Sequence, residues 1–199
     1  FSEVAFPAVE GAVRSLAVLD REGDGDPDLV LGLVSTDVYY GFPVGNRLLE
    51  NVGGAYTVSG ALPKVLSDGL PVFTGDLDGD GDADLVFQGG PSGFAGRFQP
   101  ARVHLNDGSG TFVPVRGAEK VLLATDPNRL APRVVALGDI DGDALPDVFT
   151  PQRVLVNGPP GVLTPLAPSL PGLPLACPPF TPRPVTDVAL GAVAGDGDL

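Results

Sequence analysis

The apolar residues of this chain fall into short runs separated by Gly, Pro and Asp, and these runs predict strands. Residues 16–19 and 134–137 are typical runs of this kind. Short apolar runs bounded by turn residues are characteristic of β-strands joined by tight turns. The chain carries 22 Pro residues, which recur too often to leave room for long helices. The pattern therefore predicts an all-β protein.

An Asp-rich motif recurs along the chain, three times in full and a fourth time in part. It has acidic residues at alternate positions, a small residue near its middle, and an apolar pair after its ninth residue. The full copies begin at Asp20, Asp76 and Asp139, and the partial copy covers residues 192–199. Self-similarity at a regular long period is the signature of a repeat architecture.

A hairpin motif runs in phase with the acidic motif. Residues 47–56 match residues 103–112, and residues 154–163 form a looser third copy. Each copy has the order strand, Asn/Gly turn, strand, which is a hairpin signature. In the second period the strand candidates are residues 72–74, 85–87, 102–105 and 112–115.

Four short antiparallel strands per period are what one blade of a β-propeller requires. We therefore expect an all-β propeller fragment of four-stranded antiparallel blades, with a β-solenoid as the structural alternative. The fragment is expected to fill residues 1–199 as one domain and to hold about three and a half blades. The repeats are expected at approximately residues 7–56, 57–112, 113–163 and 164–199, the last of them incomplete.

The acidic motif has the composition of a calcium-binding loop. Side chains at its positions 1, 3, 5 and 9 and the backbone carbonyl at position 7 supply oxygen ligands, and a Gly at position 6 permits a sharp turn. Hard oxygen ligands at a flexible site favour Ca²⁺ over Mg²⁺, and the loops lack the His and Cys that zinc and copper prefer. The predicted metal-binding residues are Asp20, Glu22, Asp24, Asp26, Asp28, Asp76, Asp78, Asp80, Asp82, Asp84, Asp139, Asp141, Asp143, Leu145 and Asp147.

The acidic motif has two alternative interpretations, a helical calcium loop and a turn without metal. The helical EF-hand loop needs a Glu at its twelfth position and flanking helices, and neither is present here. Asp/Gly turns kept for solubility are the other alternative. Carboxylates crowded into nine residues without a cation would repel one another, which favours the metal.

The four copies are unequal. The second is the most regular, so it is expected to form the tightest site. Glu22 replaces an Asp in the first copy and weakens or rearranges coordination, and Ala144 replaces the turn Gly in the third. Ala192 and Ala194 remove two ligands from the fourth copy, which is expected to be empty. We therefore predict two to three Ca²⁺ ions.

The Asp-rich loop followed by Asp-Leu-Val, in phase with Leu-Asn-x-Gly-x-Gly-x-Phe, resembles the FG-GAP/VCBS repeats of integrin α-subunit-like propellers. The resemblance implies a propeller, commonly seven-bladed, with each Ca²⁺ in the loop between the first two strands of a blade. Seven blades of this size would need roughly twice the present length. We therefore expect the chain to be part of a longer polypeptide, with assembly from several copies as the alternative.

The formal net charge of −13 argues against nucleic acid and anionic membranes as partners. No apolar run reaches the 18 or more residues of a membrane span, so membrane insertion is not expected. The single cysteine, Cys177, excludes a disulfide within the chain and is interpreted as a small apolar side chain. With calcium loops that suit a calcium-rich environment, the chain is predicted to be secreted or on the cell surface.

The predicted function is a non-catalytic binding or adhesion module for an extracellular protein or glycan. Residues 35–45 and 89–100 carry aromatic side chains next to Gly and are candidate contact loops, or else pack onto their own blade. The alternatives are a structural spacer in a surface filament or assembly, and a non-catalytic part of a larger secreted enzyme. No enzyme is expected within these residues, because His104, the single His, lies in a predicted strand and no catalytic motif accompanies it.

Overall fold

The fold is built from antiparallel β-sheets. The computed structural model describes residues 5–34, 43–60, 62–63, 71–88, 90–92, 97–99, 101–116, 134, 136–150, 154–158 and 162–166. Within these ranges there are 14 strands and no helix, so the described part of the chain has no helix that could cross a membrane. The all-β class predicted from the sequence is confirmed.

Three four-stranded sheets form the body of the structure, each from one stretch of the chain. Sheet one consists of β1 (Ala12–Leu19), β2 (Asp28–Val34), β3 (Pro43–Val52) and β4 (Ala55–Ser59). Sheet two consists of β5 (Val72–Gly75), β6 (Asp84–Phe87), β9 (Arg102–Asn106) and β10 (Phe112–Pro114). Sheet three consists of β11 (Ala136–Gly138), β12 (Asp147–Phe149), β13 (Val154–Gly158) and β14 (Val162–Pro165).

Each of these sheets is a meander in which every strand pairs antiparallel with its neighbour in the same order. The four strands expected in the second period are confirmed as β5, β6, β9 and β10. A two-stranded ribbon, β7 (Gly90–Ser92) with β8 (Arg97–Gln99), is inserted between β6 and β9. This ribbon lies within residues 89–100, one of the two candidate contact loops.

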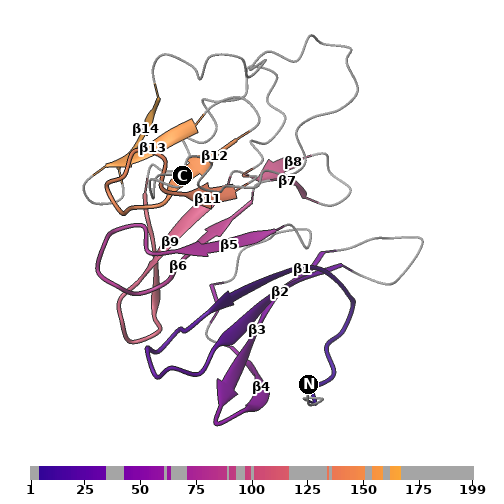
Figure 1. Cartoon of the computed structure of the whole chain (residues 1–199). Helices are drawn as coiled ribbons and strands as arrows, with labels where there is room; N and C mark the ends of the chain where they lie inside the picture. The colour runs from indigo at the N-terminus through magenta and orange to yellow at the C-terminus, as the bar shows by residue number, and fades with distance from the viewer. Residues whose placement is uncertain are drawn as a thin grey trace, which may run out of the picture.

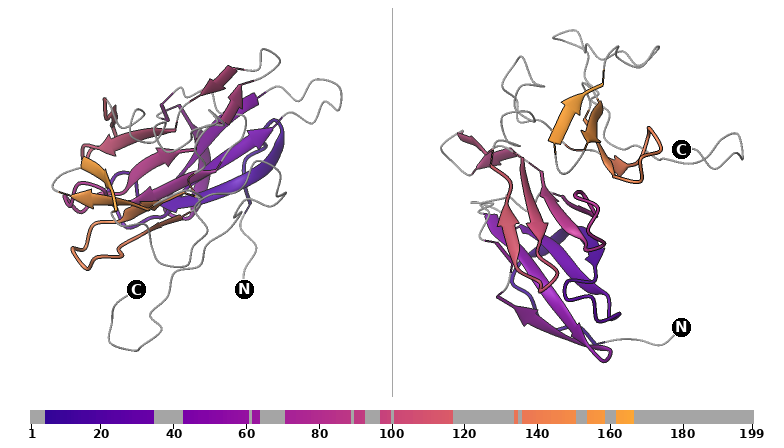
Figure 2. Two further views of the ribbon diagram at one scale, coloured as in Figure 1. Left: turned by 90° about the horizontal axis from the view of Figure 1, so that it is seen from above. Right: turned by 90° about the vertical axis from the view of Figure 1, so that its left-hand side faces the viewer.

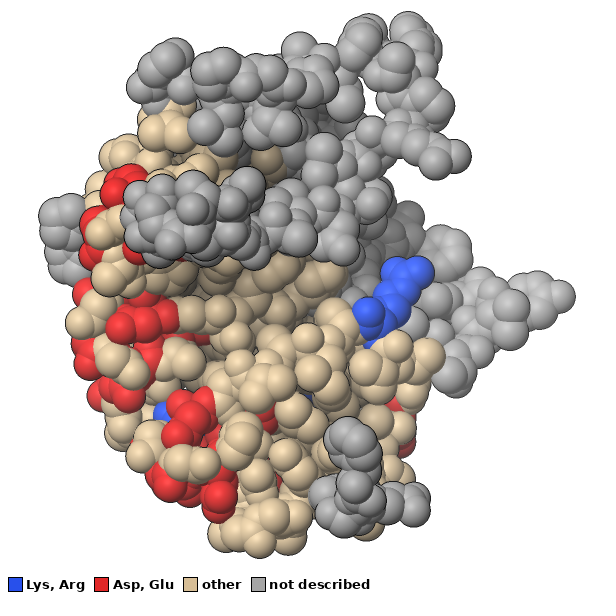
Figure 3. All heavy atoms as spheres, viewed as in Figure 1, with Lys and Arg blue, Asp and Glu red and all other residues tan. Residues whose placement is uncertain are grey.

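The three sheets are stacked in chain order, with sheet two between sheets one and three (Figures 1 and 2). Each sheet turns the loop between its first two strands toward the same side of the stack (Figure 1). These connections are the first loop (residues 20–28), the second loop (76–84) and the third loop (139–147). Asp and Glu side chains gather on that side of the molecular surface (Figure 3).

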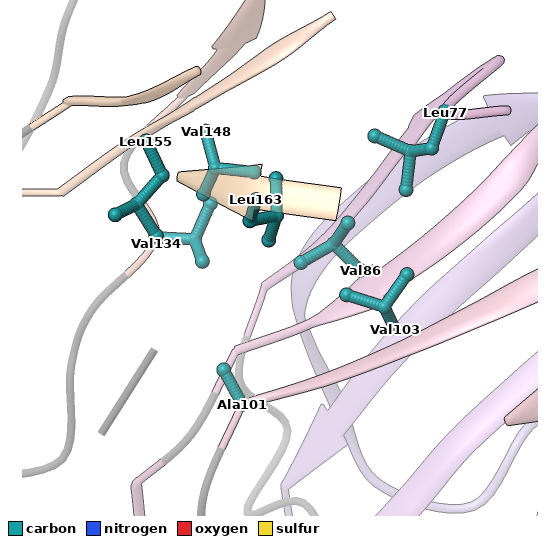
Figure 4. Packing of buried hydrophobic residues seen from close by; sticks show 8 residues of the cluster. All are labelled: Leu77, Val86, Ala101, Val103, Val134, Val148, Leu155 and Leu163. Atoms are coloured by element: carbon teal, nitrogen blue, oxygen red, sulfur yellow. The ribbon is translucent and has the colours of Figure 1, made fainter. Parts of the chain in front are cut away.

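Apolar side chains from facing sheets form the two main core clusters. Between sheets one and two, the buried residues are Ala17, Leu19, Val30, Leu48, Val72, Leu85, Phe87 and Phe112. Between sheets two and three, they are Leu77, Val86, Ala101, Val103, Val134, Val148, Leu155 and Leu163 (Figure 4). Removing each Val, Leu or Phe side chain from water stabilises the fold by about 1.5–3 kcal/mol. The stacking of the sheets, which brings the acidic loops into a row, therefore rests on these two clusters.

Several expectations lie outside the described residues. These are residues 167–199 of the partial repeat, with the fourth acidic loop, the Cys177 side chain, and residues 35–42 of the contact loop 35–45. The side chains of Phe94 and Phe98 also lie outside them.

Candidate metal sites

The three acidic loops occupy equivalent positions in the three sheets. Each loop follows the first strand of its sheet and ends on the first residue of the second strand, which is Asp28, Asp84 or Asp147. This Asp lies opposite the last residue of the first strand, as in the pair Gly75 and Asp84. In each sheet the pairing of the first two strands therefore holds the two ends of the acidic loop next to each other, in the same way in all three loops.

The Asp at position 1 shapes the loop by accepting hydrogen bonds from its backbone. In the second loop, Asp76 Oδ1 accepts from the N–H of Gly79 at 2.7 Å, and Asp76 Oδ2 accepts from that of Gly81 at 2.9 Å. Asp139 bonds in the same way to the N–H groups of Gly142 and Ala144, at 2.7 and 2.8 Å. Side-chain bonds of this kind hold a turn in place without any regular secondary structure.

The Asp at position 9 is fully buried in all three loops, with 0% of its surface exposed. Each carboxylate accepts one N–H from position 2 of its own loop and one from the Asn that begins the hairpin turn of its own sheet. For Asp84 these donors are Leu77 and Asn106, both at 2.7 Å. Asp147 accepts from Ile140 at 2.8 Å and from Asn157 at 2.7 Å, and Asp28 follows the same pattern.

Two of the loops bring three carboxylates together. In the second loop, one carboxylate oxygen each from Asp76, Asp78 and Asp84 lie within 4.8 Å of one another. The third loop does the same with the matching residues Asp139, Asp141 and Asp147. These are positions 1, 3 and 9 of the motif, so three of the predicted ligands in each loop converge as expected. A group of this geometry is able to hold a metal ion.

The electrostatics of the second loop fit a cation. Burial, followed by the nearby charges of Asp78 and Asp80, raises the pKa of Asp84 from 3.8 to about 6, although two backbone N–H groups oppose the rise. Burial and the neighbouring Asp80 and Asp76 also raise the pKa of Asp78. Asp78 Oδ1 is buried and has no hydrogen-bond partner among the described residues. A buried carboxylate oxygen without a donor is a group that a cation would satisfy.

The third loop shares the electrostatics of the second. Burial is the main cause that raises the pKa of Asp147, and Asp141 and Asp143 add to the rise. Asp84 and Asp147 thus respond to the same surroundings in two sheets. Burial and the neighbouring carboxylates disfavour the ionised form of both groups, and a divalent ion nearby would favour it.

The remaining predicted ligands of these two loops have other contacts. At position 5, Asp80 and Asp143 are exposed, and each accepts the N–H of position 7 at 2.9 Å. At position 7, the Asp82 carboxylate lies against Gly108 of the hairpin in its own sheet, where an added Cβ would meet Asp82 Oδ2 at 2.6 Å. The Leu145 side chain packs on Gly79 of the second loop. These residues stay predicted ligands outside the two triads.

The first loop differs from the other two. Among the described residues, Asp20, Glu22 and Asp28 are not part of a group of three converging carboxylates. Glu22 instead forms an ion pair with the adjacent Arg21. Asp24 accepts the N–H of Asp26, and Asp26 accepts the N–H of Gly53 at 2.7 Å.

Sequence reasoning missed the role of the hairpin asparagines. It placed Asn106 and Asn157 in turns, but both side chains are buried and reach the preceding sheet. Asn106 Nδ2 donates to the carbonyl of Arg21 at 2.9 Å, and Asn157 Nδ2 donates to that of Leu77 at 2.7 Å. Each acceptor is position 2 of the preceding acidic loop. The fixed phase between the two motifs was the signal that could have suggested this link.

Neither the family models nor the curated proteins compared with the sequence give a match. The resemblance to FG-GAP/VCBS repeats therefore stays a prediction. Among solved structures, one match is a lectin from Agrocybe aegerita, described by its specific recognition of non-reducing terminal N-acetylglucosamine. The identity is 22% and the TM-score is 0.46, and the match covers 75% of this chain. The chain spans 36% of the lectin, and a likeness this distant leaves fold and function to the residues themselves.

Proposed function

We propose that the chain is part of a calcium-stabilised extracellular β-propeller that serves as a non-catalytic binding module for a protein or glycan. The observation that carries the proposal is the repetition of one carboxylate triad at equivalent positions of two sheets. Acidic groups that cluster by chance have no reason to recur at the same three motif positions. Oxygen-only ligands in a loop of this kind suit Ca²⁺.

Calcium in this proposal has a structural role. When bound, the ion supplies the positive charge that Asp76, Asp78 and Asp84 need in order to be ionised together. Asp84 also fixes position 2 of the loop and the hairpin Asn through its two backbone hydrogen bonds. Metal binding is therefore coupled to the packing of the sheet, and it shifts the folding equilibrium toward the native state.

The stacking of the sheets supports the propeller. Val72 of sheet two is 5% exposed because its face packs on sheet one, and it lies opposite Phe87 in the register of β5 and β6. In sheet one, the equivalent residue is Leu16, which lies opposite Leu31. Leu16 is 55% exposed, and Val18 on the same face is 50% exposed. We propose that this apolar face packs against another sheet of the same kind, as in a propeller.

The surroundings of His104 support a non-catalytic role for this part of the protein. The ring is 5% exposed in β9 and meets Phe87 edge-on, with the ring centres 5.3 Å apart. Burial, aided by the nearby Arg102, lowers its pKa and favours the neutral form. The side chain is therefore buried against Phe87 within sheet two.

The metal part of the proposal is tested by counting bound ions in single variants. Asp78→Asn and Asp141→Asn are each expected to lower the number of bound Ca²⁺ ions by one, because each removes the position-3 ligand of one triad. Glu10→Gln is the matched control at an exposed acidic residue outside the loops. Unchanged ion numbers in both loop variants would reject the two triads as the metal sites.

The binding part is tested with immobilised glycans and extracellular proteins. Binding that is lost when calcium is chelated, and restored when it is added back, is the expected result. A folded, calcium-loaded protein that binds no member of either panel would favour the structural spacer over the binding module.

A further inference from the structure

The first loop carries two changes that distinguish it from the other two loops. Position 2 is Arg21, where the second and third loops have Leu77 and Ile140. Position 3 is Glu22, where the other loops have an Asp. The first loop, in which the triad does not form, thus has a cationic residue at position 2 where the other two loops have an apolar one.

The Arg21 guanidinium is nearly buried and is surrounded by hydrogen-bond acceptors from sheets one and two. Its side chain is 11% exposed, and it forms ion pairs with Glu22 and with Glu50, whose Oε1 lies 3.1 Å from Nη2. Nη1 donates to the carbonyl of Gly110 in the hairpin of sheet two, at 3.0 Å. A Cβ at Gly110 would collide with the guanidinium, so the fit on this side is close.

The backbone of the first loop, in contrast, keeps the arrangement of the second. The N–H of Arg21 donates to Asp28 at 3.0 Å, as that of Leu77 donates to Asp84. The carbonyl of Arg21 accepts from Asn106 of the next sheet at 2.9 Å. The frame of the loop is therefore conserved between the two copies, and what differs is the side chains that decide whether a cation is bound.

We infer that the Arg21 guanidinium is the built-in counter-charge of the first loop, which folds without a divalent ion, and that metal binds at the second and third loops. The inference rests on the proposed function for those two loops. Glu22 is turned to the guanidinium and withdrawn from the triad position. The fixed positive charge of the guanidinium also repels a divalent cation at this loop.

Arg21 also connects two sheets, which a metal ion within the first loop would not do. Its guanidinium links Glu50 of sheet one to the Gly110 carbonyl of sheet two. This polar link between the two sheets adds to their apolar contact and is independent of the calcium concentration. The contact between sheets two and three involves the second loop, which depends on the ion.

Ion counting in three variants at position 1 tests the inference in the intact chain. Asp76→Asn and Asp139→Asn are expected to lower the number of bound Ca²⁺ ions from two to one. Asp20→Asn is expected to leave the number at two. Three ions in the wild type, with one lost in Asp20→Asn, would overturn the inference and leave the proposed function standing.

A variant designed to gain a calcium site provides a second test of the inference. The double variant Arg21→Leu with Glu22→Asp gives the first loop the residues of the second at positions 2 and 3, so it is expected to bind one additional Ca²⁺ ion. Arg14→Leu, which changes the net charge equally at an exposed position of β1, is the control and is expected to gain none.

The two arms separate the ways in which the account could fail. A folded double variant with no additional ion would overturn the role of Arg21. Absence of bound calcium from the wild type would reject the proposed function instead. If the double variant does not fold, the three position-1 variants still decide the question.

Discussion

The buried Asp84 carboxylate makes the stability of the metal-free protein depend on pH in an unusual direction. Its pKa is raised from 3.8 to about 6 in the folded state, so the folded state binds more protons than the unfolded state between these values. Stability from this group is therefore highest at low pH and is lost as the pH rises through 6. Under the proposed function, bound calcium would oppose this dependence, because protonation of Asp84 would compete with the ion.

Chemical unfolding in the presence of a chelator tests this pH dependence of the stability. The stability of the wild type relative to Asp84→Asn should be about 1 kcal/mol greater at pH 5 than at pH 7. The comparison with Asp84→Asn cancels groups that titrate with the opposite sign, of which His104 is one. A relative stability that is greater at pH 7 would contradict the raised pKa.

Ala144 occupies the backbone conformation that the other two loops give to glycine. Its φ is +70°, and the equivalent Gly81 has φ +95° and Gly25 φ +88°. A left-handed conformation costs a residue with a Cβ about 1–2 kcal/mol, part of which Gly loses again through its greater freedom in the unfolded chain. Ala144→Gly should therefore raise the free energy of unfolding by about 0.5–1 kcal/mol.

Gly81→Ala is the matched reverse change, and it should lower the free energy of unfolding by a similar amount. A Cβ at Gly81 meets no atom within 4 Å, so the effect would come from the backbone conformation alone. Both variants are measured by urea unfolding at saturating calcium. Effects of the same sign in the two variants would show that the loops do not share one conformation.

At the scale of elements, the hairpin of sheet three and the second loop form one unit. Asn157 is 0% exposed and donates from Nδ2 to the Leu77 carbonyl, while the Leu77 N–H donates to Asp84. The backbone of one residue of the second loop, Leu77, thus contacts both its own triad and the next sheet. Movement of sheet three would therefore change the position of Leu77 and, through it, the carboxylate triad of the second loop.

Asn157→Ala should lower the free energy of unfolding by about 1–3 kcal/mol, because it leaves the Leu77 carbonyl buried without a donor. It should also weaken calcium binding at the second loop. The control is Asn51→Ala, whose acceptor, the Pro27 carbonyl, also receives the Tyr56 hydroxyl at 3.1 Å. Equal losses from the two variants would argue against a link specific to sheets two and three.

Much of this element structure could be predicted from the sequence, because its signals are local. Short apolar runs bounded by turn residues predict the strands, and the spacing of acids in the second loop predicts that Asp76, Asp78 and Asp84 converge. The role of Arg21 could not be predicted in this way. Its partner Gly110 lies 89 residues further along the chain, so the contact depends on how two sheets pack. Asn157 and Leu77 illustrate the same limit.

At the scale of the whole molecule, the row of acidic loops follows from the stacking of the sheets. The two apolar clusters align the sheets, and the alignment places all three loops on one side of the molecule (Figures 1 and 3). The sequence predicts the repeat and hence the stacking order. How Leu145 and Pro146 of the third loop come to pack on Gly79 and Gly75 could be read only from the structure.

The most direct test of the central claim is the number of calcium ions bound per chain, measured by elemental analysis after dialysis into trace calcium. Melting curves with and without a chelator accompany it. We predict two ions per chain and a lower melting temperature after chelation, since the triads of the second and third loops then lose their counter-charge. A chain that carries no calcium and melts at the same temperature with the chelator would show that these loops are only turns.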